Sequence, residues 1–225
     1  GSLVGGYFAS EIKPNLEKRE IDYELCLISQ WHEHFFSNQS SEKTHAVQVN
    51  ENKVALTLLN CFLLRLIATD GLRVAIALRT EDPREIQFYR DLFGNKVSIH
   101  HKSGVPIGPG YGAKTFSTYF LMLRSNLVVG LNSTCLSEAF GLGKKVLWCN
   151  LKSYERFAMP EAGISYLDTD DYERFSDRIR VLLAMTEEEY EKKVEGKREF
   201  INAIGNSPPV HKAIYSQLLT ALKER

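Results

Sequence analysis

Residues 127–150 read LVVGLNSTCLSEAFGLGKKVLWCN, and this stretch decides the fold. Two apolar runs, residues 127–131 and 146–149, enclose a segment that opens with Asn-Ser-Thr and closes with Gly-Leu-Gly-Lys-Lys. Short, continuous apolar runs indicate strands that are buried on both faces. Ser133 and Thr134 favour the start of a helix, and glycine commonly follows the end of one. The stretch therefore predicts a strand, a helix that begins at its hydroxyl pair, and a second strand.

The same alternation continues on both sides of this stretch. Further strands are predicted at residues 23–29, 73–78, 97–100 and 164–167, and helices at residues 51–70, 82–93, 115–124, 171–185, 187–204 and 210–223. Strands that alternate with helices indicate a parallel sheet covered by helices on both faces. The prediction is a single Rossmann-like α/β domain at residues 23–225, with a sheet of about six strands and a helical C-terminal tail.

The composition narrows the class of protein. Hydrophobic residues make up 44% of the 225, which is enough for a packed core, and the 28 Lys and Arg residues balance the 28 Asp and Glu residues. This balance gives no basic field that would gather nucleic acid. The longest apolar run, residues 54–68, is interrupted by polar and charged side chains and indicates a buried helix. Four scattered cysteines without a Cys-x-x-Cys pair are typical of reduced, buried thiols in a cytosolic protein.

The first candidate site follows the strand at residues 127–131. Ligands of parallel sheets bind beyond the carboxyl ends of the strands. A helix that starts there presents free N–H groups and the positive end of its dipole, which suits a phosphate or a diphosphate. Glu138 lies on the same helix face as Thr134, where it could accept hydrogen bonds from vicinal hydroxyls such as those of a ribose. The structural alternative is that Ser133 only caps the helix and Glu138 is only solvated.

At this point the stretch resembles the C-terminal, nucleotide-sugar-binding half of GT-B-fold glycosyltransferases. There a Ser or Thr pair is followed by Glu-Ala and then by Gly-Lys-x-Val. The matching residues here are Ser133, Thr134, Glu138, Ala139, Gly143, Lys144 and Val146. The resemblance is closest to bacterial enzymes of surface-carbohydrate assembly, which make polysaccharide and lipopolysaccharide. It extends to sugar-nucleotide 2-epimerases and polyol-phosphate polymerases. It implies that the hydroxyls and helix amides hold the donor diphosphate and that Glu138 binds the ribose.

The resemblance also implies roles for residues at the ends of other predicted strands. The residues expected to bind the nucleotide or the donor are Ser29, Gln30, His100, Lys102, Asn132, Ser133, Thr134 and Glu138. Arg79, at the end of the second strand, is the candidate catalytic residue, because a basic group there would neutralise the leaving diphosphate. An arginine at a strand end is equally often an exposed structural residue.

The N-terminal segment resembles a hinge. Residues 3–10 read LVGGYFAS, and residues 1–22 are interpreted as a linker from a missing N-terminal domain. That domain would supply most of the acceptor site, so this chain is expected to bind a donor without turning it over. Trp31, Phe35 and Phe36 are predicted to be exposed on the face that the missing domain would cover.

The expected function is therefore transfer of a sugar from a nucleotide-activated donor to a surface-polysaccharide acceptor. No cofactor or metal is expected, since Asp168-Thr169-Asp170 follows the last strand and is interpreted as a helix cap. The expected partners are a nucleotide-sugar, a carbohydrate acceptor and the N-terminal domain, without nucleic acid. The full enzyme is expected in the cytoplasm, in peripheral association with a membrane. Two alternatives stay open: a sugar-nucleotide 2-epimerase, or a non-catalytic binding domain that keeps the fold.

Overall fold

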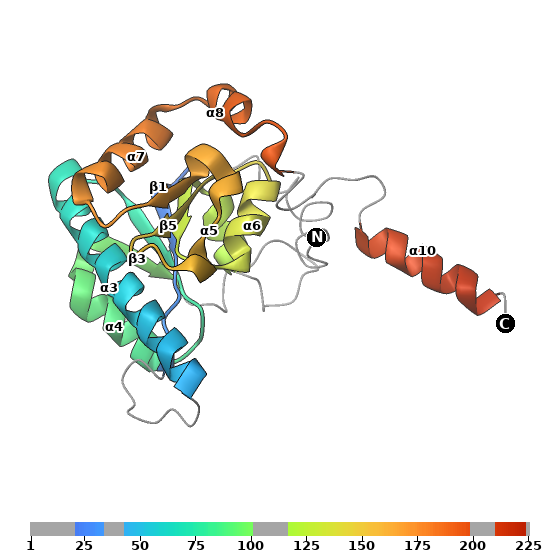
Figure 1. Cartoon of the computed structure of the whole chain (residues 1–225), viewed down its shortest axis with the longest axis horizontal. Helices are drawn as coiled ribbons and strands as arrows, with labels where there is room; N and C mark the ends of the chain where they lie inside the picture. The colour runs from blue at the N-terminus through green and yellow to red at the C-terminus, as the bar shows by residue number, and fades with distance from the viewer. Residues whose placement is uncertain (1–20, 34–42, 101–116, 199–209, 224–225) are drawn as a thin grey trace.

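The computed structural model describes residues 21–33, 43–100, 117–198 and 210–223. Its centre is a six-stranded sheet with strand order β3-β2-β1-β4-β5-β6, in which every neighbouring pair is parallel (Figure 1). The strands are β1 (Tyr23–Ile28), β2 (Val74–Ala77), β3 (Val97–His100), β4 (Ser125–Gly130), β5 (Lys145–Asn150) and β6 (Tyr166–Asp168). The order reverses between β1 and β4, which makes their carboxyl ends the topological switch point of the sheet.

The strands are apolar along their length because both faces of the sheet are covered. All residues of β2 and β5 are buried, and β1 and β4 are buried over most of their length. Lys145 is the charged residue of β5. Its buried ammonium donates to the carbonyl oxygen of Leu182 at 3.1 Å and to that of Met185, which satisfies a charge that would otherwise be costly to bury.

Two layers of helices enclose the sheet. The described helices are α3 (Lys43–Asp70), α4 (Pro83–Phe93), α5 (Ser117–Leu123), α6 (Thr134–Gly141), α7 (Tyr172–Ala184), α8 (Glu187–Val194) and α10 (Val210–Lys223), of which α10 is not part of either layer (Figure 1). Helices α3, α4 and α7 lie on one side, and α5 and α6 pack together on the other (Figure 1). This arrangement follows from right-handed crossovers that run outward from β1 and then, after β3, in the opposite direction. The fold confirms the predicted Rossmann-like α/β class.

Helix α3 is the longest element and lies against the sheet. By length and composition alone, its part Val49–Asp70 could cross a membrane, although the core helix of a globular protein passes the same test. Leu56, Leu59 and Leu63 recur at helical spacing and are no more than 1% exposed, so they form the stripe that contacts the core. This packing explains the apolar composition of α3 and agrees with the prediction of a buried helix.

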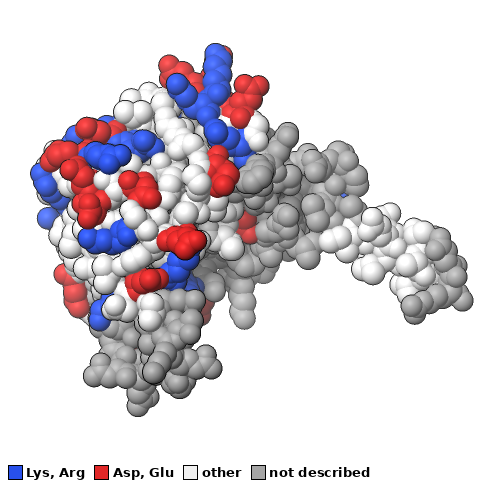
Figure 2. All heavy atoms as spheres, in the orientation of Figure 1, with Lys and Arg blue, Asp and Glu red and all other residues white. Residues whose placement is uncertain are grey.

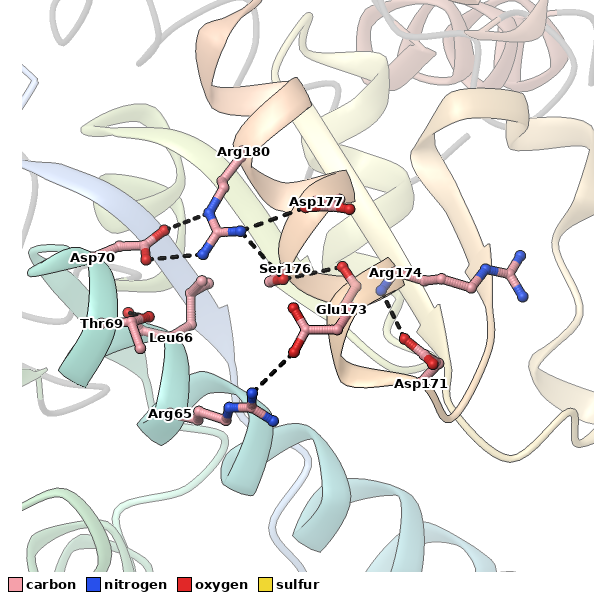
Figure 3. Close-up of polar contacts among 10 residues, drawn as sticks. All are labelled: Arg65, Leu66, Thr69, Asp70, Asp171, Glu173, Arg174, Ser176, Asp177 and Arg180. Atoms are coloured by element: carbon pink, nitrogen blue, oxygen red, sulfur yellow. Dashed lines mark hydrogen bonds and ion pairs between the residues drawn. The ribbon is translucent and has the colours of Figure 1, made fainter.

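The outer surfaces of α3 and α7 are held together by ion pairs. Figure 3 shows Arg180 of α7 donating from two nitrogens to the carboxylate of Asp70, at 2.8 and 3.0 Å, and Arg65 donating to Glu173 at 2.9 Å. The first interaction holds the pKa of Asp70 below its ordinary value, mainly through the hydrogen bond from Arg180. On the face shown in Figure 2, Lys and Arg side chains are interspersed with Asp and Glu.

Several expectations about the elements need correction. Helix α3 begins at Lys43 rather than near residue 51, and two 3-10 helices that the sequence did not predict, η4 (Glu155–Phe157) and η5 (Pro160–Ser165), fill the connection from β5 to β6. Helix α8 ends at Val194, within the helix predicted at residues 187–204, and residues 199–204 lie outside the described part of the chain. Residues 1–20 lie outside the described part of the chain, so the hinge at residues 1–22 stays a prediction.

The prediction of exposed aromatic residues was wrong for Trp31, which is 1% exposed. The guanidinium of Arg84 lies 5.8 Å from the centre of its ring and covers it. Phe35 and Phe36 lie outside the described residues. Exposed apolar side chains occur instead on α10, at Ile214, Tyr215, Leu218, Leu219 and Leu222.

The cysteines are mixed in exposure. Cys26 and Cys149 are buried and free, and burial raises the pKa of each thiol above its ordinary value. Cys135 is half-buried and Cys61 is exposed, so the expectation of buried thiols holds for only part of the set.

Candidate functional site

The site begins where β4 ends and α6 starts. Ser133 is the N-cap of α6: its side-chain oxygen accepts a hydrogen bond from the backbone N–H of Cys135 at 3.3 Å, and its carbonyl accepts from Leu136. Thr134 is the first residue of the helix and is exposed. The prediction that these two residues start a helix at the carboxyl edge of a parallel sheet is confirmed. The N-terminal end of α6 thus lies next to the switch point, where its dipole favours an anion.

Gln30 joins the two strands that flank the switch point. Its side-chain oxygen accepts from the N–H of Asn132 at 2.8 Å, and its side-chain nitrogen donates to the carbonyl of the same residue. The side chain of Asn132 donates in turn to the carbonyl of Arg156 at 3.2 Å. Gln30 and Asn132 were both predicted to contact the donor. In the structure their polar groups fix the loop that leads into α6, so they shape the site.

Arg156, whose carbonyl accepts from Asn132, also contacts helix α3. Its guanidinium lies 2.6 Å from the carboxylate of Glu51 and donates to the side-chain oxygen of Asn52 at 3.1 Å. Both partners belong to α3, so the loop after β5 is tied to the helix that follows β1. No local sequence pattern predicts this link, because 104 positions separate Arg156 from Asn52.

Ser29 has a different place from the one predicted. It is 3% exposed, donates to the carboxylate of Glu85 at 2.5 Å, and accepts from the N–H of Trp31 at 3.2 Å and from the hydroxyl of Tyr89 at 2.9 Å. One donor and two acceptor positions are all that a serine hydroxyl has. The prediction that Ser29 contacts the donor is therefore wrong, because its hydroxyl is fully used by hydrogen bonds within the protein.

Arg79 lines a cavity of about 240 Å³. The residues around this cavity are Trp31, His32, Glu33, Arg79, Thr80 and Asp82. The guanidinium of Arg79 donates to the carbonyl of Trp31 at 3.3 Å. The two acidic residues of the cavity wall are paired with a different arginine, since Arg84 lies 2.5 Å from Asp82 and 3.3 Å from Glu33. Among the described residues, no carboxylate is within ion-pair distance of the Arg79 guanidinium, which leaves its charge for an anion.

Glu138 was expected on an exposed helix face, and this expectation was wrong. The residue is 7% exposed, and its carboxylate accepts a hydrogen bond from the hydroxyl of Tyr119 on α5. Burial, followed by the neighbouring carboxylate, raises the pKa of Tyr119 well above its ordinary value, so the hydroxyl keeps its proton and stays a donor. One carboxylate oxygen of Glu138 has this partner, and the ribose contact stays a prediction for the other.

The third strand contributes less than expected. Nε2 of His100 lies 2.9 Å from the hydroxyl of Tyr23, and the two rings meet edge to face at 5.7 Å. The ring of His100 is thus already engaged within the domain. Lys102 lies outside the described residues, and its role stays a prediction.

Around Arg79, the sequence interpretation missed Thr80, Glu85 and Tyr89. Asp82-Pro83-Arg84-Glu85 does carry a signal, because a carboxylate three residues after an N-cap is a common helix-capping pattern. That pattern predicts a helix start, and it does not predict that the carboxylate turns toward the strand ends.

Comparison with known proteins supports the architecture. No protein-family model matches the chain, and no curated protein matches it. Among solved structures, it is similar to the UDP-GlcNAc 2-epimerase of Neisseria meningitidis bound to UDP-GlcNAc, with 19% identity, a TM-score of 0.51, and coverage of 97% of this chain and 51% of that chain.

Two further structures agree with the first. The UDP-GlcNAc 2-epimerase of Methanocaldococcus jannaschii, in complex with UDP-GlcNAc and UDP, matches with 14% identity and a TM-score of 0.53 over 97% of this chain and 54% of that chain. Sucrose-phosphate synthase of Thermosynechococcus elongatus matches with 14% identity and a TM-score of 0.52 over 98% and 51%. The chain spans about half the length of these proteins. It has a Rossmann-like α/β fold of the type found in GT-B proteins.

Proposed function

We propose that this chain is the nucleotide-sugar-binding domain of a glycosyltransferase that acts on a surface-polysaccharide acceptor. The observation that carries the proposal is the exposed N-terminus of α6 at the switch point, on the same carboxyl edge of the sheet as Arg79 and its cavity. A helix N-terminus and a cation that has no carboxylate partner in the described part of the chain are both suited to a diphosphate. The solved structures support a nucleotide-sugar in particular, since two of them contain UDP-GlcNAc.

In this proposal each residue has one task. The amides of α6, with the hydroxyls of Ser133 and Thr134, hold the diphosphate, and Glu138 accepts a hydrogen bond from the ribose. Arg79 stabilises the negative charge that develops on the leaving diphosphate. The helix dipole and the guanidinium supply this charge stabilisation without a metal ion. The acceptor, the remaining domain, a cytoplasmic location and peripheral membrane association belong to the proposed whole protein.

A second candidate is a sugar-nucleotide 2-epimerase, the activity that the names of two similar structures give. Both candidates bind the same ligand through the same groups, so they differ in the products. Incubation of the complete protein with UDP-GlcNAc separates them. Release of UDP that depends on an added carbohydrate supports transfer, whereas a C2 epimer that appears without an acceptor supports epimerisation.

Calorimetric titration of this chain with UDP, GDP, CDP and CMP tests the binding step. We expect one of the diphosphates to bind and to raise the melting temperature of the chain, because a ligand that binds only the folded state stabilises it. The proposal fails if none of the four binds.

A charge substitution localises the site. Thr134→Asp places a carboxylate at the first position of α6, where the helix dipole tolerates it but a phosphate does not. We expect this variant to fold and to lose diphosphate binding. Thr57→Asp, at an exposed position of α3, carries the same change of charge and should bind as the wild type does. Equal diphosphate binding by both variants would show that the diphosphate does not bind at the N-terminus of α6.

A further inference from the structure

Glu85 is a completely buried carboxylate in the first turn of α4. It accepts four hydrogen bonds: from the hydroxyl of Ser29 at 2.5 Å, from the N–H of Arg79 at 2.9 Å, and from the N–H and hydroxyl of Thr80 at 2.8 and 2.6 Å. Ser29 follows β1, and Arg79 and Thr80 follow β2. One side chain therefore joins a helix to the carboxyl ends of two strands.

The hydrogen bonds continue from Glu85 to both anchors of the Arg79 side chain. Glu85 fixes the backbone of Arg79 directly. Through Ser29 it also fixes Trp31, whose N–H donates to the serine oxygen at 3.2 Å. The carbonyl of Trp31 then accepts from the guanidinium of Arg79 at 3.3 Å. The carboxylate of Glu85 thus positions both the backbone and the guanidinium of Arg79, which lines the 240 Å³ cavity.

Helix capping alone does not account for this arrangement, and α8 provides an internal comparison. Glu189 occupies the same third helical position of α8, where its carboxylate accepts from the N–H of the N-cap Thr186 at 2.8 Å, as a capping box requires. In α4 the N–H of the N-cap Asp82 donates instead to the hydroxyl of Thr80 at 3.2 Å. The carboxylate of Glu85 is therefore turned away from the cap and toward the strand ends.

A gain in folding stability also does not explain why a carboxylate is buried at Glu85. Burying a charged group costs several kcal/mol before its partners compensate, and apolar replacements of buried ionic groups are often neutral or stabilising. The four donors satisfy the hydrogen-bonding capacity of the carboxylate, and their main effect is to hold the ends of β1 and β2 in one arrangement. What they fix is the edge of the candidate site.

We propose that Glu85 is a positioning residue that holds Arg79 toward the diphosphate of the ligand. The inference rests on the proposed nucleotide-sugar function and adds to it the residue that orients its cation. Glu85 does not touch the ligand, and its effect passes through Arg79. It should therefore matter for a ligand with a second phosphate and hardly matter for one without it.

The test compares UDP with UMP in calorimetric titrations of the wild type and of Glu85→Gln. The glutamine has the same shape, but it turns an N–H₂ group toward neighbouring donors and so disturbs the anchor of Arg79. We expect the dissociation constant for UDP to rise about tenfold, the effect of losing one interaction with a charged group, while that for UMP changes by less than about twofold. In Glu85→Gln, a further Arg79→Ala change should add little, because the two residues act as one unit.

Matched variants separate positioning from folding. Glu189→Gln changes the same residue at the same helical position of α8 and should leave both dissociation constants unchanged. If Glu85→Gln does not fold, Ser29→Ala removes the link between Glu85 and Trp31 and should show the same preference for weakening UDP.

Each result decides a different question. Equal loss of UDP and UMP affinity, or no loss of either, in a folded variant overturns the positioning role while the proposed function stands. A wild type that binds none of UDP, GDP, CDP and CMP overturns the proposed function and the inference together.

Discussion

At the scale of single residues, neighbouring side chains decide what a polar group can do. Glu138 and Ser29 both occupy positions suited to a ligand contact. Ser29 is saturated by three hydrogen bonds within the protein, whereas Glu138 shares its carboxylate with Tyr119 alone among the described residues. A group with an unused acceptor can still bind a ligand. Glu138 is therefore the better candidate of the two.

We expect Glu138→Ala to lower the free energy of unfolding by about 1–3 kcal/mol, because the buried hydroxyl of Tyr119 loses its acceptor. Urea unfolding measures this change. Adding Tyr119→Phe removes the hydroxyl that donates to Glu138, so the double variant should lose less stability than the sum of the two single losses. Strict additivity would show that the hydrogen bond contributes nothing. In nucleotide titrations, Glu138→Ala should also lose the ligand-induced rise in melting temperature if the ribose contact exists.

At the scale of elements, the ends of helices and the contacts between them position the site. Ser133 caps α6, and two residues after the helix ends at Gly141 the chain turns at Gly143, which has φ +89° and whose N–H donates to the carbonyl of Phe140 at 3.1 Å. Both ends of this short helix are thus fixed by residues specialised for them. A fixed helix keeps its N-terminus pointed at one place.

Ser133→Ala should cost roughly 0.5–2 kcal/mol of stability, the usual value of an N-cap side chain. Thermal unfolding of Ser133→Ala and Ser133→Thr makes the comparison, since threonine keeps the capping oxygen and should lose little. Equal losses in the two variants would mean that the side-chain oxygen does not support the helix.

The pair between α3 and α7 predicts a dependence on pH. Asp70 has a lowered pKa in the folded state, so its contribution to stability is present above the pKa of the unfolded chain. That contribution disappears as the pH falls through the lower, folded-state pKa. Asp70→Asn should therefore be less stable than the wild type at pH 7, and the difference should vanish in the acid range.

Urea unfolding at a series of pH values measures this effect of Asp70. Glu173→Gln is the control, because both side chains of the Arg65–Glu173 pair are more than half exposed, at 58% and 67%, and water and salt screen them. It should change stability little at any pH. A difference between Asp70→Asn and the wild type that stays constant with pH would rule out this account of the ion pair.

At the scale of the whole molecule, the sheet and its two helix layers form one core, and α3 is central to it. Leu63 is fully buried on the sheet side of α3. We expect Leu63→Ala to cost about 2–5 kcal/mol, the range for a large-to-small change in a packed core. Denaturant unfolding gives the value, and Thr57→Ala on the exposed side of the same helix should be nearly neutral. A small effect at Leu63 would be incompatible with α3 as a core helix.

Only part of the candidate site could be predicted. The strand-hydroxyl-helix order around Ser133 predicted the start of α6. The sequence also placed Arg79 at the end of the second strand, and in the structure this residue lines the cavity. Glu85, Tyr89 and Tyr119 could not be found in this way. The contacts of Glu85 and Tyr89 with Ser29 span 56 and 60 positions, and that of Tyr119 with Glu138 spans 19, so no local pattern records them.

The sequence by itself determined the class of fold. Apolar runs, caps and glycines act over a few residues, so periodicity and turn chemistry were enough to predict a parallel sheet between helices. Only the tertiary structure decided which polar groups remain free for a ligand. Burial and hydrogen-bond saturation depend on residues brought together from distant strands: Gln30 meets Asn132 across 102 positions, and Ser29 meets Glu85 across 56. The chemistry of the site therefore depends on the packing of the strand ends, which no stretch of the chain specifies alone.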